Sequence, residues 1–130
     1  YKHSKEREVI KERDFLYSIV ENQDAEGVIF VKSNSRLIKV KTNNILFVEA
    51  LKDYVVINLG DVKYTIHSTM KDIQKKLPAK EFQRIHRSYI VRLDKIIVIE
   101  QPNVVIEGGK KMLPIGGSYK EDLFKRINLV

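Results

Sequence analysis

The sequence of 130 residues predicts a mainly β fold of antiparallel strands with two short helices, preceded by an N-terminal linker helix. Three observations support this prediction. Apolar residues follow helical spacing only up to Asn22, they alternate or run continuously from Val28 onward, and turn-forming residues separate the later runs. The chain therefore divides into residues 1–27, a linker, and residues 28–130, a folded domain.

The linker prediction rests on an amphipathic pattern between residues 4 and 22. Apolar side chains recur near helical spacing among charged neighbours, at Val9, Ile10, Phe15, Leu16, Ile19 and Val20. Because the chain begins at Tyr1 rather than at a methionine, we expect this helix to join the domain to an upstream domain that is missing here. Its apolar stripe would pack on the folded domain or on a second copy.

Strands are expected wherever β-branched and aromatic residues cluster between turn residues. The turns fall at Ser33-Asn34-Ser35, Gly60-Asp61 and Gly108-Gly109, with a loop from Glu49 to Asp53. Nine strands follow, at residues 28–31, 37–41, 45–48, 54–59, 62–67, 84–93, 96–99, 104–107 and 112–115.

Two capping-box patterns predict the two short helices of the domain. Thr69-x-x-Asp72 would open the first helix, which Pro78 ends, and Ser118-x-x-Glu121 would open the second. The expected buried stripes are Met70, Ile73 and Leu77 in the first helix, and Tyr119, Leu123 and Ile127 in the second.

Composition narrows the classes of function. The chain has no cysteine, which excludes disulfides and thiolate metal sites, and no apolar run approaches the roughly 18 residues of a membrane span. We therefore expect a cytoplasmic protein without cofactor or metal. Nineteen Lys/Arg against ten Asp/Glu in residues 28–130 favour a polyanionic partner, with nucleic acid first, although surplus lysines can also serve solubility alone.

The segment from Phe82 to Val91 places polar and cationic groups just before an apolar run. Arg84 and Arg87 each carry a planar fork of N–H donors, Ser88 a hydroxyl and His86 a ring nitrogen that can donate or accept. Such a cluster is suited to binding a phosphate or a guanine edge. An ordinary polar turn with one packed histidine is the alternative.

This segment and three other blocks, in the same order along the chain, resemble the LytTR family of DNA-binding domains. The resemblance extends from Val28 to Ile127, and four ordered blocks are far more specific than any one of them. The other blocks are Ile45-Leu46-Phe47-Val48-Glu49-Ala50 with Asp53-Tyr54-Val55, then Ser68-Thr69-Met70-Lys71, and last Leu113-Pro114-Ile115 with Ser118-Tyr119-Lys120. The family fold implied is an elongated assembly of small antiparallel sheets that contacts DNA through loops.

The resemblance implies three DNA-facing loops. In the first, Lys52 and Asp53 would read bases, and in the second Arg87 would read a base while Arg84, His86 and Ser88 contact the backbone or support the loop. The third comprises Gly116, Gly117, Ser118 and Lys120 at a helix start, where phosphate would bind, and the hairpin residues Lys110 and Lys111 would add charge nearby. Many family members have an arginine where this chain has Gly117, so one base contact would be missing or shifted.

Family membership would also imply the mechanism and the partners. The loops would enter successive major grooves of double-stranded DNA at promoter direct repeats, and the domain would be the output half of a two-component response regulator. An upstream receiver domain, phosphorylated in the full-length protein, would then drive pairing of two copies on DNA.

Two other classes of function compete with this interpretation. His67 and His86 could form an acid–base pair for phosphodiester cleavage, although no motif of a known hydrolase or phosphate-binding loop accompanies them, so we expect no enzyme. The basic surface could instead bind RNA or an acidic protein. An RNA reader needs exposed aromatic side chains, whereas Tyr54, Tyr64, Tyr89 and Tyr119 mostly fall where core packing is expected.

Overall fold

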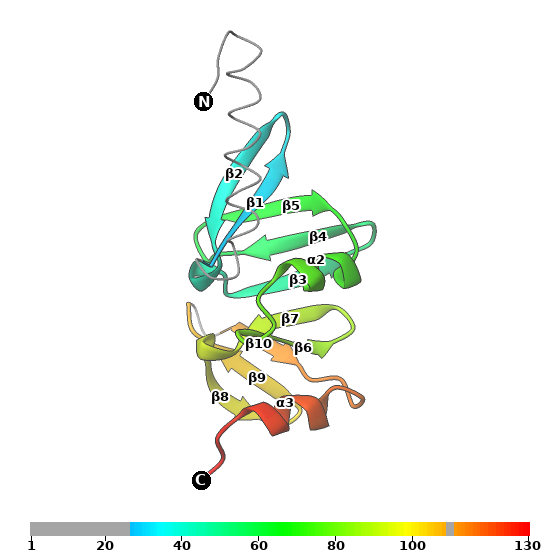
Figure 1. Cartoon of the computed structure of the whole chain (residues 1–130). Helices are drawn as coiled ribbons and strands as arrows, with labels where there is room; N and C mark the ends of the chain where they lie inside the picture. The colour runs from blue at the N-terminus through cyan, green and yellow to red at the C-terminus, as the bar shows by residue number, and fades with distance from the viewer. Residues whose placement is uncertain (1–26, 109–110) are drawn as a thin grey trace, which may run out of the picture.

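The computed structural model describes residues 27–108 and 111–130, and its fold is mainly β, as predicted (Figure 1). The predicted linker helix and Lys110 lie outside the described residues. The described strands are β1 (Val28–Ser33), β2 (Arg36–Lys41), β3 (Phe47–Leu51), β4 (Tyr54–Asn58), β5 (Lys63–His67), β6 (Phe82–His86), β7 (Tyr89–Arg92), β8 (Ile96–Glu100), β9 (Asn103–Ile106) and β10 (Lys111–Pro114). The helices are α2 (Met70–Lys76) and α3 (Lys120–Arg126), with single 3-10 turns at η1 (Thr42–Asn44) and η2 (Leu93–Lys95).

The strands form three antiparallel sheets stacked along the long axis of the domain (Figure 1). A hairpin of β1 and β2 lies at one end, and a sheet in the order β10-β9-β8 lies at the other. Between them lies a five-stranded sheet in the order β5-β4-β3-β7-β6. This middle sheet carries the β3–β4 turn and the β6–β7 turn.

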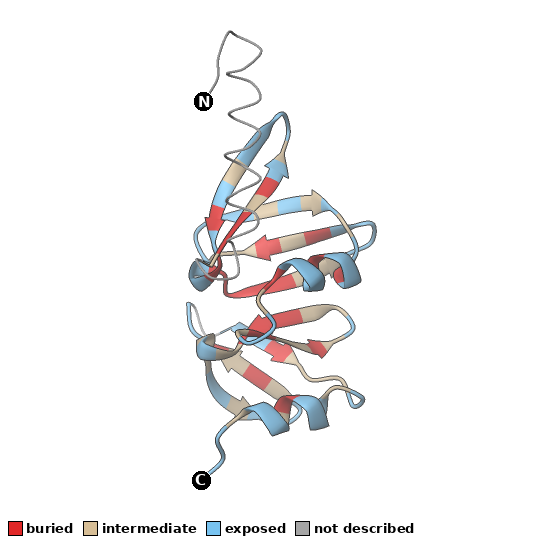
Figure 2. Ribbon diagram, in the orientation of Figure 1, coloured by how far each residue is buried: buried red, intermediate tan, exposed pale blue. Residues whose placement is uncertain are grey.

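The middle sheet is buried on both faces at β3 and β7, where neighbouring residues pack into different cores. Val48 and Ile90 belong to a first core with α2 and the β1–β2 hairpin, whereas Phe47 and Val91 belong to a second core with β9, β10 and α3. Side chains alternate between the faces of a strand, so a strand buried on both faces reads as a continuous apolar run. Burial in two cores explains the unbroken run Ile45-Leu46-Phe47-Val48, of which the last two residues begin β3 (Figure 2).

Two local predictions need correction. The segment 84–93 is not one strand but the hairpin of β6 and β7, with a register shift between Arg84 and His86. The loop expected from Glu49 to Asp53 is mostly strand, since β3 continues to Leu51 and pairs there with Tyr54. In the first case a two-residue turn, Arg87-Ser88, lies within what reads as one strand, and in the second the mixed sequence Glu49-Ala50-Leu51 has no period-two pattern.

The capping predictions differ in outcome. At α2 the Thr69 hydroxyl accepts from the Asp72 N–H at 3.0 Å, and Met70, Ile73 and Leu77 are buried, as predicted. At α3 the N-cap is Tyr119, in a helical backbone conformation and without a side-chain cap. The capping box expected at Ser118 is therefore wrong.

The buried side chain of Arg92 forms hydrogen bonds to several segments of the fold. Arg92, at the end of β7, donates from Nη1 to the Thr42 carbonyl at 3.0 Å and to Glu81 Oε1 at 2.8 Å, and from Nε to Asp94 Oδ1 at 2.8 Å. Thr42 in turn donates its N–H to the Gly27 carbonyl at 2.7 Å. Arg92 thus connects the start of β1 with the middle sheet.

Candidate nucleic-acid interface

The three predicted loops lie along one edge of the domain, here called the loop edge, on the right of Figure 1. They are the β3–β4 turn, the β6–β7 turn and the loop from β10 to α3. Backbone hydrogen bonds join them, because the Ala50 N–H donates to the Ser88 carbonyl at 2.9 Å and the Gly116 N–H to the Ile85 carbonyl at 2.7 Å. Residues far apart in sequence therefore form one continuous surface.

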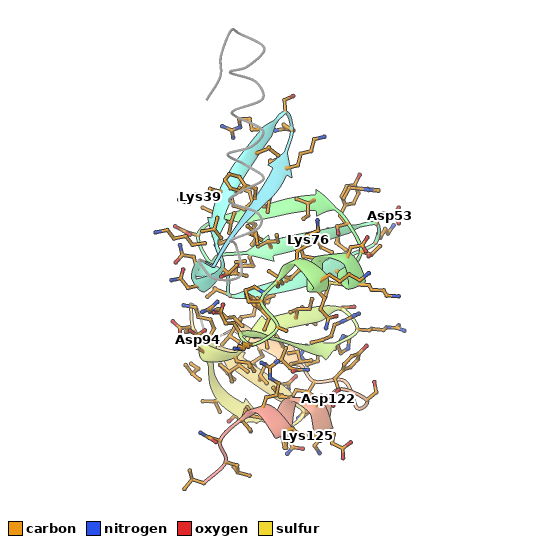
Figure 3. The ribbon with its side chains drawn as sticks, viewed as in Figure 1. Lys39, Asp53, Lys76, Asp94, Asp122 and Lys125 are labelled. Carbon is orange, nitrogen blue, oxygen red and sulfur yellow. The ribbon has the colours of Figure 1, made fainter. Side chains whose placement is uncertain are left out.

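The first loop is a two-residue turn that exposes Lys52 and Asp53. Asp53 projects from the outer end of the β3–β4 hairpin (Figure 3). Lys52 has a φ of 56°, a left-handed conformation that is uncommon for a residue other than glycine. The neighbouring Tyr54 is 45% exposed and its ring meets that of His67 edge-on at 5.2 Å, so its expected core packing is wrong.

Within the second loop the two arginines differ in what they contact. Arg84 donates from Nη2 to the Arg87 carbonyl at 2.6 Å, from Nε to the His86 carbonyl at 3.2 Å and from Nη1 to Gln74 Oε1 at 3.5 Å. The Arg87 side chain is exposed and has no hydrogen-bond or ion-pair partner among the described residues. Arg84 therefore holds the turn, and Arg87 presents its donors to solvent.

His86 and Tyr89 hold the base of the same turn. The Ser88 N–H donates to His86 Nδ1 at 3.0 Å, and the centres of the His86 and Tyr89 rings lie 5.6 Å apart. The Tyr89 hydroxyl donates to Glu49 Oε2 at 3.2 Å. Burial and the neighbouring Glu49 carboxylate raise the pKa of Tyr89, so its phenol stays protonated around neutral pH.

Arg84→Ala is expected to weaken duplex binding about tenfold by releasing the turn, although Arg87 remains in place. Amide hydrogen exchange at Ser88, measured by NMR, should accelerate in the same variant. The lysine substitution distinguishes support from direct contact, since lysine keeps the charge but lacks the planar fork that reaches two carbonyls. Wild-type affinity and exchange in Arg84→Lys would contradict the supporting role.

The two glycines of the third loop differ in the space around them. A Cβ at Gly116 would lie 3.0 Å from Tyr119 Cδ2 and 3.6 Å from the His86 Cα, whereas a Cβ at Gly117 would meet no atom within 4 Å. Gly116 thus permits close contact with the second loop, and position 117 has room for a side chain. Ser118 and Lys120 are exposed, and the Lys120 ammonium lies 5.8 Å from the centre of the Phe124 ring.

Lys111 does not lie with the third loop, contrary to the prediction. It begins β10, whereas the third loop follows the end of that strand. Its ammonium lies 5.9 Å from the centre of the Phe47 ring, against the second core. The hairpin direction, which the sequence leaves open, places its charge at the opposite edge.

The alternative of a histidine pair is not supported by the positions of the two rings. His67 ends β5 and His86 ends β6, and these are the two outer strands of the five-stranded sheet. Within residues 27–108 and 111–130, no group of three or more His, Asp or Glu side chains could hold a metal ion. In the same residues, no helix has the length and hydropathy needed to span a bilayer.

Several side chains of the interface could not be found from the sequence. Gln74 of α2 and Glu49 of β3 support the second loop from elements distant in sequence, and the Arg84 guanidinium lies 5.7 Å from the centre of the Tyr119 ring. None of them belongs to a local motif that distinguishes a supporting residue from an ordinary polar one. Only the strand order brings them together.

Known proteins share both the sequence pattern and the fold. The family model described as LytTr DNA-binding domain matches residues 35–128. The sensory transduction protein LytT of Bacillus subtilis is 26% identical over 123 residues, which cover 90% of this chain and 50% of the relative. LytT of Bacillus anthracis is 28% identical over 99 residues, covering 72% of this chain and 39% of the relative. The chain thus spans half or less of the length of these relatives.

The fold has a solved counterpart. A LytTr DNA-binding domain of a response regulator from Bacillus cereus superposes with a TM-score of 0.65 at 22% identity, covering 77% of this chain and 95% of that domain. At this identity the likeness concerns the fold, which matches the resemblance expected from the four sequence blocks. Since the family model covers most of residues 28–130, the chain belongs to the LytTR family of DNA-binding domains.

Proposed function

We propose that this chain binds double-stranded DNA sequence-specifically through its loop edge and thereby regulates transcription. The observation that carries the proposal is the second loop, where Arg84 fixes the turn and leaves the Arg87 guanidinium exposed and unpaired among the described residues. An arginine held in this way can donate two hydrogen bonds to the major-groove edge of a guanine. The first and third loops flank it on the same edge.

In this proposal the loops have different roles. Lys52 and Asp53 read bases beside Arg87, since an ammonium can donate to guanine and a carboxylate can accept from the cytosine amino group. His86 and Ser88 shape the turn. The third loop contacts phosphates through Lys120, Ser118 and the backbone of Gly116 and Gly117, which fixes position without reading sequence.

Gly117 alters the division of specificity. An arginine at this position, as in many family members, would read a base from the third loop, and the open space there would accommodate it. With glycine at position 117, the third loop keeps its phosphate contacts but has no side chain there to contact a base. Arg87 and the first loop then carry more of the sequence preference.

The arrangement fits an output domain of a response regulator. Three loops on one edge could enter successive major grooves on one face of a duplex, and a pair of direct repeats would accommodate two copies. The relatives carry the name sensory transduction protein and are at least twice as long as their matched part. We infer an upstream receiver domain whose phosphorylation drives pairing on promoter DNA in the cytoplasm.

Selection of bound sequences from random duplex tests this function. We expect a recovered pair of direct repeats with a guanine in each half-site, and we expect duplex to outcompete single-stranded DNA and RNA of the same sequence. The RNA alternative would use the exposed Tyr54 ring, in the same hairpin as Lys52, to stack on a base. Equal affinity for the three nucleic acids would favour that alternative and remove specific duplex recognition.

A further inference from the structure

The three-stranded sheet exposes an apolar patch on the face that points away from the second core. Val98 pairs with Val105, and Val105 pairs with Met112, so these side chains form one row across β8, β9 and β10. Val98 is 44% exposed, Met112 52% and the neighbouring Ile97 51%. A contiguous exposed apolar patch of this kind is characteristic of an interaction site.

β8 is also the edge strand of its sheet, with β9 on one side and no strand of the described residues on the other. The register with β9 shifts between Ile96 and Val98, which is a β-bulge: β8 has one more residue here than β9. As a result, the side chains of Ile97 and Val98 both lie on the exposed face. Ile96 and Ile99 pack against the second core instead. Figure 2 shows β8 as a largely exposed strand at the outside of the domain.

The backbone of this strand can accept a partner strand at two points. The Lys95 carbonyl accepts from the Glu107 N–H at 2.9 Å, so the backbone of Lys95 faces β9. Backbone groups of a strand alternate in direction, and therefore those of Ile96 face the open side. Ile99 follows the bulge, and its side chain faces the second core as that of Ile96 does. Residues of one strand whose side chains face the same side also direct their backbone groups the same way, so the N–H and C=O of Ile99 face the open side as well.

The sequence of β8 is complementary to itself when two copies run antiparallel. In the order Lys95-Ile96-Ile97-Val98-Ile99-Glu100, a two-fold axis between Ile97 and Val98 places each Lys95 opposite Glu100 of the second copy. The same register places Ile96 opposite Ile99, so that the two open backbone positions meet. Opposite charges directly across an antiparallel pair are stabilising.

We propose that β8 is a self-association surface on which a second copy of this chain docks, joining the two three-stranded sheets into one. The bulge selects this partner, because a regular strand lacks the extra residue, whereas a second copy carries it at the same place. The Ile97 and Val98 side chains of both copies then form a single apolar patch at the axis. The paired strand is short, so we expect weak association, in the micromolar to millimolar range of dissociation constants.

This surface is separate from the loop edge, since no residue assigned to the three loops lies on β8. The Ile115 N–H donates to the Pro102 carbonyl at 2.8 Å, so β8 runs toward the third loop. Antiparallel pairing reverses this direction in the second copy, and the two loop edges then point away from each other. Such a dimer would hold two separate duplex segments, and its formation does not depend on the proposed DNA binding.

Charge exchange in the full chain tests the proposal by sedimentation velocity over a range of concentrations. We expect the wild type to dimerise, and Lys95→Glu and Glu100→Lys each to weaken dimerisation about tenfold, because each places two like-charge pairs across the axis. A mixture of the two single variants should dimerise like the wild type, since both pairs are then opposite in charge. The double variant should dimerise as well.

Lys125→Glu is the matched control, because it makes the same charge change at an exposed residue of α3, which is not part of the three-stranded sheet. It should leave association unchanged. A wild type that stays monomeric up to millimolar concentration would overturn the proposal, and so would single variants that dimerise like the wild type. Failure of the mixture to dimerise would also count against this register, provided that circular dichroism shows both variants folded.

Discussion

Arg87→Ala is expected to lower affinity for the selected duplex by about 1–3 kcal/mol, roughly 5- to 150-fold, and to change nonspecific affinity far less. The guanidinium is exposed at the tip of a turn that the Arg84 side chain already fixes. Truncation therefore removes the base contact without releasing the loop. Fluorescence anisotropy with the selected duplex and with duplexes changed at one guanine measures both quantities.

Lys120→Ala provides the control for this experiment. A lysine that contacts phosphate adds affinity on any sequence, so its loss should weaken specific and nonspecific binding by the same factor and reduce the salt dependence by about one counterion. Arg87→Lys should resemble the alanine variant in specificity, because an ammonium cannot donate in a planar pair. Equal losses on both kinds of duplex from Arg87→Ala would exclude Arg87 as a base reader.

Arg92→Met is expected to lower the free energy of unfolding by about 1.5–3 kcal/mol. Methionine preserves the aliphatic contacts but removes the Nη1 donor from the buried Thr42 carbonyl, which keeps only the Ile45 N–H at 3.2 Å. It also removes the interaction with the Phe82 ring, whose centre lies 5.5 Å from the guanidinium carbon. The carboxylates of Glu81 and Asp94 regain water, since their side chains are 40% and 64% exposed. Most of the cost therefore arises from the lost Arg92–Thr42 hydrogen bond and the lost contact with the Phe82 ring. Urea unfolding followed by far-UV circular dichroism gives the value.

Asp94→Asn distinguishes the contribution of the Arg92–Asp94 ion pair from that of the buried Arg92–Thr42 hydrogen bond. The Asp94 side chain is 64% exposed, and partly exposed ion pairs contribute at most about 1 kcal/mol. We therefore expect a small loss from this substitution. A loss as large as that of Arg92→Met would show that the ion pair, rather than the bond to Thr42, stabilises this junction.

Much of the fold could be predicted from local sequence patterns. The apolar run at 45–48 indicated a strand, which the structure places at Phe47–Leu51, and Thr69 with Pro78 bounded α2, because apolar runs and capping are properties of a few neighbouring residues. The four ordered blocks also identified the family, and the three loops that they implied do lie on one edge.

The remaining features depend on contacts between distant residues. Arg84 and Arg87 are three residues apart and chemically alike, yet Arg84 bonds within the turn whereas Arg87 has no partner in the described part of the chain. The reason is that Gln74 and the β6–β7 register surround only Arg84. Lys111 seemed close to the third loop in sequence, but β10 runs its full length between them. Neither the different contacts of the two arginines nor the position of Lys111 can be predicted from residue type and spacing.

The two-sided burial of β3 and β7 has a consequence for how the domain unfolds. The first core supports the β3–β4 turn and the second core supports the loop before α3, but both cores take side chains from the same two strands. Neither core can be exposed to water while the other keeps its full set of contacts. Thermal denaturation of the described part of the chain should thus be a single cooperative transition, and a ligand bound at any one loop raises the melting temperature of all three.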